Sequence, residues 1–274
     1  MDREEAFKLF EKMIEVAEKE LFRFTLNMKL NISNKLDKTI VTSCDLHIDK
    51  ILSKIARLNG FQVISEEGEK DKAIVKSGNY LTIDPIDGSL GYIEHIDYAI
   101  RHGGIDNFLK IDIGPMSDFC LLIGIVEKGA PRFGCCYHYV TKERILLDSE
   151  TLDNCIIENK KRKYSGKDVC YVGPRRISTQ SREILNIGGV GRIVQATLGL
   201  KSLYALINNH KNAILIHAEQ QSGLWDVLPS AVAARVFGGA ILDGNGKNLI
   251  YNKYVNIQQV IVIKGERFLQ YVKN

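Results

Sequence analysis

The sequence predicts a mixed α/β protein made of two closely packed lobes, and two observations carry this prediction. Residues 1–150 combine amphipathic helical patterns with β-hairpin patterns, which is typical of helices that cover an antiparallel sheet. Residues 151–274 instead alternate short apolar strand patterns with helical patterns, which is typical of an α/β lobe. A chain of 274 residues is long enough for one large domain or for two lobes that share a core.

The first lobe begins with two helical patterns. Apolar side chains at positions 7, 10, 14, 17 and 21 keep one helical face buried over residues 2–28, and Asp2 with Glu5 has the spacing of a capping box. A second helix is predicted after the segment "TSCD", and Asn-Gly at 59–60 is its stop signal. Asp45 therefore lies near the N-terminus of this second helix.

Strand patterns follow in the same lobe. They are "FQVIS" (61–65), "YLTID" (80–84), and a hairpin of "CLLIGIVEKG" and "RFGCCYHYV" with its turn at 129–131. Because Pro85 has no N–H to give to a sheet, we expect the second of these strands to end at Asp84. The polar, glycine-containing stretch 100–118 is interpreted as a loop or flap that closes over a site.

The second lobe alternates strands and helices. The expected order is strand "VCYVG", helix 178–186, strand 191–195, helix 199–209 and strand "NAILIHA". A further helix is predicted in "LWDVLPSAVAARVFGG", with Asp226 as its N-cap, Pro229 in its first turn and Gly-Gly at its end.

Composition excludes several classes of protein. With 45% hydrophobic and 26% charged residues the chain is an ordinary globular protein, and a net charge of +4 is too weak to indicate a nucleic-acid polymer as partner. Its N-terminus is acidic and amphipathic and no apolar run could span a bilayer, so we expect a cytoplasmic monomer or homodimer with no membrane partner.

The cysteines form no C-x-x-C pair and are interpreted as reduced, buried thiols: Cys44, Cys120, Cys135, Cys136, Cys155 and Cys170.

Five acidic side chains lie where predicted elements begin or end: Asp45, Glu66, Asp84, Asp87 and Asp226. Any one of them could be a helix cap or a turn residue. Taken together, carboxylates at converging element ends form the ligand set that a hard ion such as Mg²⁺ prefers. A cation would also relieve the repulsion between Asp84 and Asp87, which stand three residues apart on a tight turn.

These motifs resemble those of one known family. "SEEG", then "DPIDGS", then "WD" followed by "GG" is similar, in order and spacing, to the inositol monophosphatase superfamily of magnesium-dependent, lithium-sensitive phosphatases. The resemblance extends over residues 42–239. It implies a layered α-β-α-β-α fold and a phosphomonoester hydrolase that uses two or three Mg²⁺ ions per site.

The resemblance also implies site residues. The metal ligands would be Glu66, Asp84, the Ile86 carbonyl, Asp87 and Asp226. Asp45 would lie near a weaker third metal and act with Glu66 and Ser89 in catalysis, where the last two orient the attacking water. The substrate contacts would come from Asp87, Gly88, Ser89, Lys201, Glu219 and Asp226.

The substrate stays open among three phosphomonoesters. The segments "DGSLGYIEHIDYA" and "LGLKSLYAL" resemble segments of bisphosphate nucleotidases. Lys201, in the second segment, would match a lysine that binds the substrate in those enzymes, although this segment departs from their pattern. Glu219 instead matches the place of an inositol-binding glutamate. We therefore favour a 3′(2′),5′-bisphosphate nucleotidase, with inositol monophosphatase and fructose 1,6-bisphosphatase as alternatives. A non-catalytic relative that binds a phosphorylated ligand is the alternative from a different class.

Overall fold

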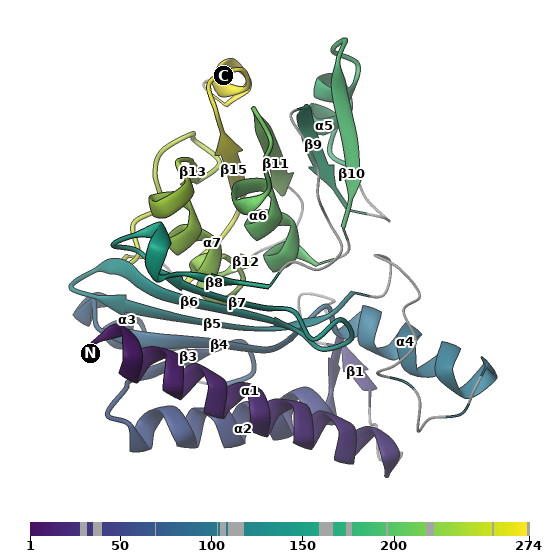
Figure 1. The fold of residues 1–274 in the computed structure, drawn as a ribbon, viewed down its shortest axis with the longest axis vertical. Coiled ribbons are helices and arrows are strands. Elements are labelled where there is room, and N and C mark those ends of the chain that lie inside the picture. The colour runs from purple at the N-terminus through teal and green to yellow at the C-terminus, as the bar shows by residue number, and fades with distance from the viewer. Residues whose placement is uncertain are drawn as a thin grey trace.

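The protein has five alternating layers of helices and sheets (Figure 1). A computed structural model describes residues 1–27, 32–34, 40–68, 70–102, 104, 108, 118–158, 167–173, 177–195, 197–217, 222–253 and 255–272. In Figure 1, α1 (Arg3–Leu26) and α2 (Ser43–Leu58) lie below a six-stranded sheet, and α6 (Leu198–Ile207) and α7 (Leu224–Phe237) separate this sheet from a five-stranded one. Helix α5 (Thr179–Leu185) lies beside the second sheet and completes the predicted α-β-α-β-α order.

The six-stranded sheet has the order β3-β4-β5-β6-β7-β8. All neighbours are antiparallel except β3 and β4, which are parallel. The strands are β3 (Val63–Ser65), β4 (Tyr80–Asp87), β5 (Cys120–Glu127), β6 (Ala130–His138), β7 (Arg144–Asp148) and β8 (Ile156–Ile157). The short strands β1 (Ile32–Asn34) and β2 (Ile40–Thr42) form a separate antiparallel pair.

The acidic turn is the segment 84–88, which contains Asp84 and Asp87. The strand that leads into it does not end at the residue that the sequence analysis predicted. Strand β4 continues through Pro85 to Asp87, and its pairing with β5 is irregular between Asp84 and Asp87. The sheet tolerates the proline because it falls within this irregularity, where the pairing register with β5 shifts. The prediction that the strand ends at Asp84 is therefore wrong, and the bulge places both aspartates at one end of the sheet.

The helices of the first lobe follow the predicted patterns. Helix α1 has the capping box of Asp2 and Glu5, and α2 ends at the C-cap Asn59. A short helix, α3 (Lys72–Ser77), connects β3 to β4. The sequence analysis did not predict α4 (Ser89–His102), which follows the acidic turn directly. Most of the predicted flap at 100–118 lies outside the described residues, so its role stays a prediction.

The five-stranded sheet has the order β10-β9-β11-β15-β13. Its strands are β9 (Asp168–Val172), β10 (Val190–Val194), β11 (Ala213–His217), β13 (Ala240–Leu242) and β15 (Val260–Lys264). Strands β9, β10 and β11 are parallel, as the alternation of strands and helices predicts, whereas β15 pairs antiparallel with both β11 and β13. A pair of short strands, β12 (Ser222–Gly223) and β14 (Asn256–Ile257), and two 3₁₀ turns, η3 (Leu152–Asn154) and η4 (Leu269–Tyr271), complete the described elements.

Helix α7 begins earlier than predicted. Its N-cap is Gly223, whose N–H donates to the Asp226 carboxylate at 2.6 Å, so Asp226 is the third helical residue rather than the N-cap. Pro229 consequently lies inside the helix and not in its first turn. Pro229 packs against Gly134 of β6, where a Cβ would come within 2.9 Å of the proline Cα. The predicted end at Gly238 is confirmed, since this residue is the C-cap with a φ of +72°.

Three apolar clusters fill the spaces between the layers. One lies between α1, α2, α4 and the six-stranded sheet, a second joins α6 and α7 to the facing sides of both sheets, and a third covers the outer face of the five-stranded sheet. In the part of the chain that is described, no helix has the length and apolar character needed to span a membrane.

Candidate active site

Three buried or half-buried carboxylates meet between the end of β4 and the start of α7. One oxygen each from Asp84, Asp87 and Asp226 lies within 4.8 Å of the other two. Asp84 and Asp87 come from the end of β4, and Asp226 comes from the first turn of α7. The structure therefore brings together three of the side chains that the sequence analysis selected as metal ligands.

The acidic turn is held by contacts of its own backbone. The Ile86 N–H donates to Asp84 Oδ1 at 3.1 Å, and the Tyr139 hydroxyl donates to the Pro85 carbonyl at 2.8 Å. Gly88 has a φ of +99°, which side chains other than glycine rarely tolerate. A Cβ at Gly88 would also lie 2.7 Å from the Asp118 carbonyl oxygen. The turn therefore requires glycine at this position.

Asp45 and Ser89 are also part of this region. The Ser89 hydroxyl lies 2.9 Å from Asp45 Oδ1 and 3.2 Å from the Ile86 carbonyl oxygen, so it can donate to either. The other Asp45 oxygen accepts from the Thr42 hydroxyl and, at 2.8 Å, from the Thr42 N–H. These contacts connect the N-terminus of α2 to the start of α4.

Asp87 is fixed by donors that the sequence analysis did not identify. Its Oδ2 accepts the Gly199 N–H at 2.8 Å and lies 3.7 Å from the Cys120 thiol. The Thr197 side chain, which caps α6, also hydrogen-bonds to this carboxylate. The capping threonine at the start of a helical pattern was the available signal, but only the fold shows that α6 begins beside Asp87.

Four helices begin around the cluster. Asp45 is the third residue of α2, Ser89 opens α4, Gly199 lies in the first turn of α6, and Asp226 in that of α7. A helix N-terminus carries a partial positive charge and unpaired N–H groups, so it favours anions. N–H groups at the starts of α2, α6 and α7 bind the carboxylates of Asp45, Asp87 and Asp226, and the partial positive charge of the helix ends favours an anionic ligand.

Burial and mutual repulsion raise the pKa values of the site carboxylates. Burial, and then the charges of Glu66, Asp87 and Asp226, raise the pKa of Asp84 well above its ordinary value. Burial also raises the pKa of Asp87 and that of Asp45 to about 6 each. Close like charges in a buried place require a cation or protons to neutralise them.

Glu66 approaches the cluster from the loop after β3. Its N–H donates to the Ile83 carbonyl at 3.0 Å, and its side chain hydrogen-bonds to Asp84. In the same loop, the Lys70 ammonium lies 4.9 Å from the centre of the Trp225 ring, next to Asp226. The loop that carries Glu66 is thus in contact with the start of α7.

Lys201 lies deeper than a surface lysine. Its side chain is 5% exposed, and burial lowers its pKa to about 8, whereas the charge of Asp87 acts in the opposite direction. Burial, together with the charge of Lys201, lowers the pKa of His217 to about 4. Lys201 therefore lies near both Asp87 and His217. Glu219, the other predicted substrate contact, lies outside the described residues.

The donors of the cluster fit a hard metal ion. All three are carboxylate oxygens, which Mg²⁺ and Ca²⁺ prefer, and burial together with neighbouring negative charges raises the pKa values of Asp84 and Asp87. A divalent ion at this position would neutralise the cluster. The residues present are therefore suited to hold one or more such ions.

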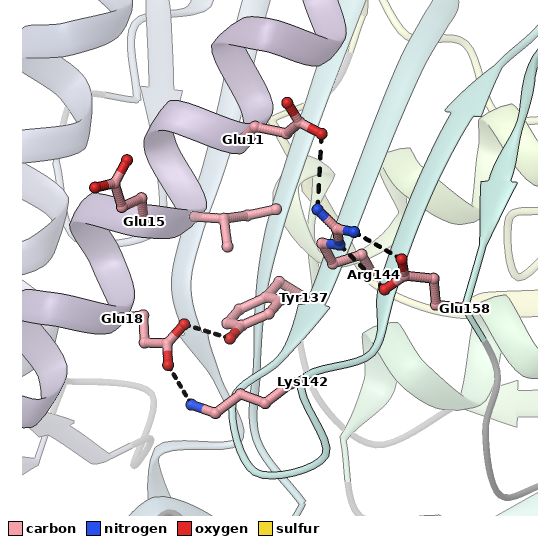
Figure 2. A pocket seen from close by; sticks show the side chains of 8 residues that line it. Glu11, Glu15, Glu18, Tyr137, Lys142, Arg144 and Glu158 are labelled. Carbon is pink, nitrogen blue, oxygen red and sulfur yellow. Dashed lines mark hydrogen bonds and ion pairs between the residues drawn. The ribbon is translucent and has the colours of Figure 1, made fainter.

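A surface groove of about 520 Å³ lies away from this cluster, between α1 and the strands β6 and β7. Figure 2 shows that Glu11 and Glu158 point toward Arg144 and that Glu18 points toward Tyr137 and Lys142, whereas Glu15 points away from them. The Tyr137 hydroxyl donates to Glu18 at 2.5 Å, Lys142 also binds Glu18, and Arg144 contacts Glu158 at 2.7 Å. The contacts of Glu18, and that of Glu11 with Arg144 at 3.7 Å, connect α1 to the sheet, and we assign the groove a structural role.

Comparison of the chain with protein families and with solved structures agrees with this fold and this cluster of carboxylates. The family model described as the inositol monophosphatase family matches residues 2–270. None of the curated protein sequences matches the chain.

Several solved structures share the fold at low sequence identity. A staphylococcal inositol monophosphatase-1, in an inhibitory complex soaked with LiCl, is 13% identical with a TM-score of 0.72 and covers 100% of this chain and 94% of that one. An IMPase/NADP phosphatase complexed with Mg²⁺ and phosphate is 14% identical with a TM-score of 0.71, covering 99% and 96%. CysQ from Bacteroides thetaiotaomicron is 17% identical with a TM-score of 0.65, covering 92% and 93%.

The layered fold and the cluster of carboxylate oxygens are those expected of a metal-dependent phosphatase. Because the family model matches nearly the whole chain, the protein belongs to the inositol monophosphatase family. Members of this family hydrolyse small phosphomonoesters and depend on metal ions, so the alternative of a non-catalytic relative is set aside.

Proposed function

We propose that this protein hydrolyses a phosphomonoester with two or three Mg²⁺ ions held by Glu66, Asp84, the Ile86 carbonyl, Asp87 and Asp226. The observation that carries the proposal is the meeting of three carboxylates within 4.8 Å at the N-termini of helices. When bound, the metal supplies charge neutralisation at the phosphate and lowers the pKa of a coordinated water. No covalent enzyme intermediate is needed.

The side chains and backbone of the protein supply the remaining chemistry. The N–H groups that follow Gly88, at the start of α4, donate to the phosphate oxygens, and the positive N-terminal end of α6, whose Gly199 N–H is bound to Asp87, adds a favourable potential. Glu66 accepts a proton from the attacking water, while the Ser89 hydroxyl, held between Asp45 and the Ile86 carbonyl, orients it. Asp45, which accepts a hydrogen bond from the Ser89 hydroxyl, lies close enough to the site to bind a third metal ion.

Release of inorganic phosphate from a panel of phosphomonoesters tests this proposal. We expect activity that needs Mg²⁺, is lost on chelation and is inhibited by Li⁺. Full activity after exhaustive chelation would overturn it. Binding of Mg²⁺ can be followed separately through the fluorescence of Trp225, the only tryptophan in the chain, which lies next to Asp226.

We propose a 3′(2′),5′-bisphosphate nucleotide as the preferred substrate. Lys201, a buried cation whose charge acts on Asp87, supports a substrate with an anionic group in addition to the phosphate that is cleaved. An inositol monophosphate has no second phosphate for this lysine to bind. The family also includes proteins crystallised with NADP or with D-inositol-1-phosphate, so inositol monophosphatase is retained as the second candidate, with Glu219 as its contact.

The Lys201→Met variant distinguishes the two substrates. If Lys201 binds a second phosphate, kcat/KM for a bisphosphate nucleotide should fall by about 10- to 100-fold, the effect of one charge-assisted contact, with little change for a simple monophosphate. An equal loss on both substrates would mean that Lys201 acts on Asp87 instead. No loss on either, with Glu219→Gln abolishing inositol phosphate turnover, would favour the inositol alternative.

We also propose that the enzyme works in the cytoplasm. All six cysteines are free thiols, which supports a reducing compartment. A fusion to a fluorescent protein, imaged in the native host, tests this assignment.

A further inference from the structure

A buried polar network lies directly behind the acidic turn, and the phosphatase chemistry described above does not use it. His138 Nε2 lies 2.9 Å from Asp118 Oδ1, and the Gln195 side-chain amide donates to Asp118 Oδ2. Asp118, His138 and Gln195 are 4%, 2% and 0% exposed. We call these three residues the Asp118 network.

The network joins three segments that are far apart in the sequence. His138 ends β6, Asp118 precedes β5, and Gln195 follows β10 in the second sheet, so the network connects the two sheets. The Thr141 N–H donates to His138 Nδ1 at 3.2 Å, which leaves the imidazole proton on Nε2 to be donated to Asp118. A buried carboxylate is tolerated only with such donors.

The network is close to the place where the phosphate is proposed to bind. A Cβ at Gly88 would meet the Asp118 carbonyl at 2.7 Å and the Thr197 methyl at 2.5 Å, so Asp118 and Thr197 enclose the turn from two sides. Gln195 is two residues before Thr197, the N-cap of α6. Two residues after Thr197, the Gly199 N–H donates to Asp87 at 2.8 Å.

We propose that Asp118 is a positioning residue, which holds the N-terminus of α6 against Gly88 and Asp87 through its bond to Gln195. The bond to His138 attaches the same carboxylate to β6, so the start of α6 is fixed relative to the six-stranded sheet. Displacing α6 would turn the Gly199 N–H away from Asp87 and change the donors that face the phosphate. This proposal rests on the proposed function, since it assumes that phosphate binds at this turn.

The first variant is Gln195→Leu, which removes the bond to α6 and puts an apolar side chain of similar size into a fully buried place. We expect kcat/KM to fall on the order of 10- to 100-fold at saturating Mg²⁺, because small misplacements of binding groups have effects of this size. We also expect the rise in melting temperature that inorganic phosphate produces, in the presence of Mg²⁺, to shrink. This second readout does not depend on turnover.

The matched control is Asp148→Asn. Asp148 is another buried carboxylate of the same sheet, 1% exposed, which binds Arg132 and lies on β7 away from the acidic turn. We expect this variant to lose stability but to keep kcat/KM and the phosphate-induced shift within about twofold. If Gln195→Leu behaves like this control, the Asp118 network is purely structural and the proposal is wrong.

A pair of variants at Asp118 provides a second test. Asparagine keeps one acceptor for His138 and offers one donor to Gln195, whose amide can turn to accept it, whereas leucine keeps neither. Asp118→Leu should therefore lose at least about tenfold more kcat/KM than Asp118→Asn, and equal losses would overturn the proposal. A wild-type protein that neither releases nor binds phosphate would instead reject the proposed function, so the two failures are distinguishable.

Discussion

The buried repulsion among the site carboxylates leads to a prediction about stability. Asp87 has its pKa raised by burial from an ordinary value of 3.8 to about 6. Because its folded-state pKa is above its unfolded-state pKa, its contribution to stability is complete below about pH 3.8 and is lost as the pH rises through about 6. Complete ionisation of this one group then destabilises the metal-free protein by about 3 kcal/mol.

The variant Asp87→Asn removes this charge and keeps the shape. The amide oxygen can still accept the Gly199 N–H that Asp87 Oδ2 now accepts, and the amide nitrogen would face the carboxylates of Asp84 and Asp226 as a donor. With chelator at pH 7.5, we therefore expect the variant to be more stable than the wild type by up to about 3 kcal/mol. A gain of that size raises the melting temperature by roughly 6–12 °C.

Thermal unfolding, monitored by circular dichroism at pH 4 and at pH 7.5, with chelator or with Mg²⁺, measures how the stability of each protein depends on pH and on the metal. The difference between the two proteins should shrink at pH 4, where Asp87 is protonated. Mg²⁺ should stabilise the wild type much more than Asp87→Asn, and kcat of the variant should fall by roughly 100-fold or more. A variant that is less stable than the wild type in chelator at pH 7.5 would refute the reasoning from repulsion, and unchanged turnover would place the site elsewhere.

Three further predictions concern other parts of the molecule. Gly88→Ala should destabilise the protein by about 1–3 kcal/mol and abolish most activity, since the left-handed φ and the neighbouring atoms leave no place for a methyl group; melting temperature and phosphate release measure both effects. Lys70→Met should change the fluorescence emission of Trp225, because it removes the cation that lies 4.9 Å from the ring centre, whereas the exposed Lys76→Met should leave the emission unchanged. Glu18→Ala, in the groove, should lower stability by about 1 kcal/mol and leave kcat/KM unchanged; a loss of activity would contradict its structural role.

Local patterns correctly predicted α1, α2, α5, α6 and α7 and the strands β3 to β6 and β9 to β11, but they missed α3, α4 and strands such as β7 and β15. The apolar spacing and the Asp2 capping box predicted α1, and the alternation of strands and helices after residue 151 predicted the order from β9 to β11. These elements depend on periodicity and on capping residues that are close in sequence, so one stretch of chain contains the whole signal. The candidate carboxylates were found in the same way, at the ends of elements.

Sequence rules failed where tertiary contacts outweighed local preference. Pro85 was expected to end β4, but the bulge beside β5 accommodates it and carries the strand to Asp87. Asp226 was expected to cap α7, but the bond from the Gly223 N–H to its carboxylate starts the helix earlier. Both residues belong to the site, where packing of several segments fixes the backbone.

The meeting of the carboxylates was decided by the tertiary structure alone. By itself the sequence determined that carboxylates would stand at element ends, and that Asp84 and Asp87 would share one turn. It could not show that α7 brings Asp226 within 4.8 Å of them, that α6 presents the Gly199 N–H to Asp87, or that Lys201 is buried. These contacts join segments distant in the chain, and they form because two sheets and the helices between them bury a common apolar core, which no local pattern of residues encodes.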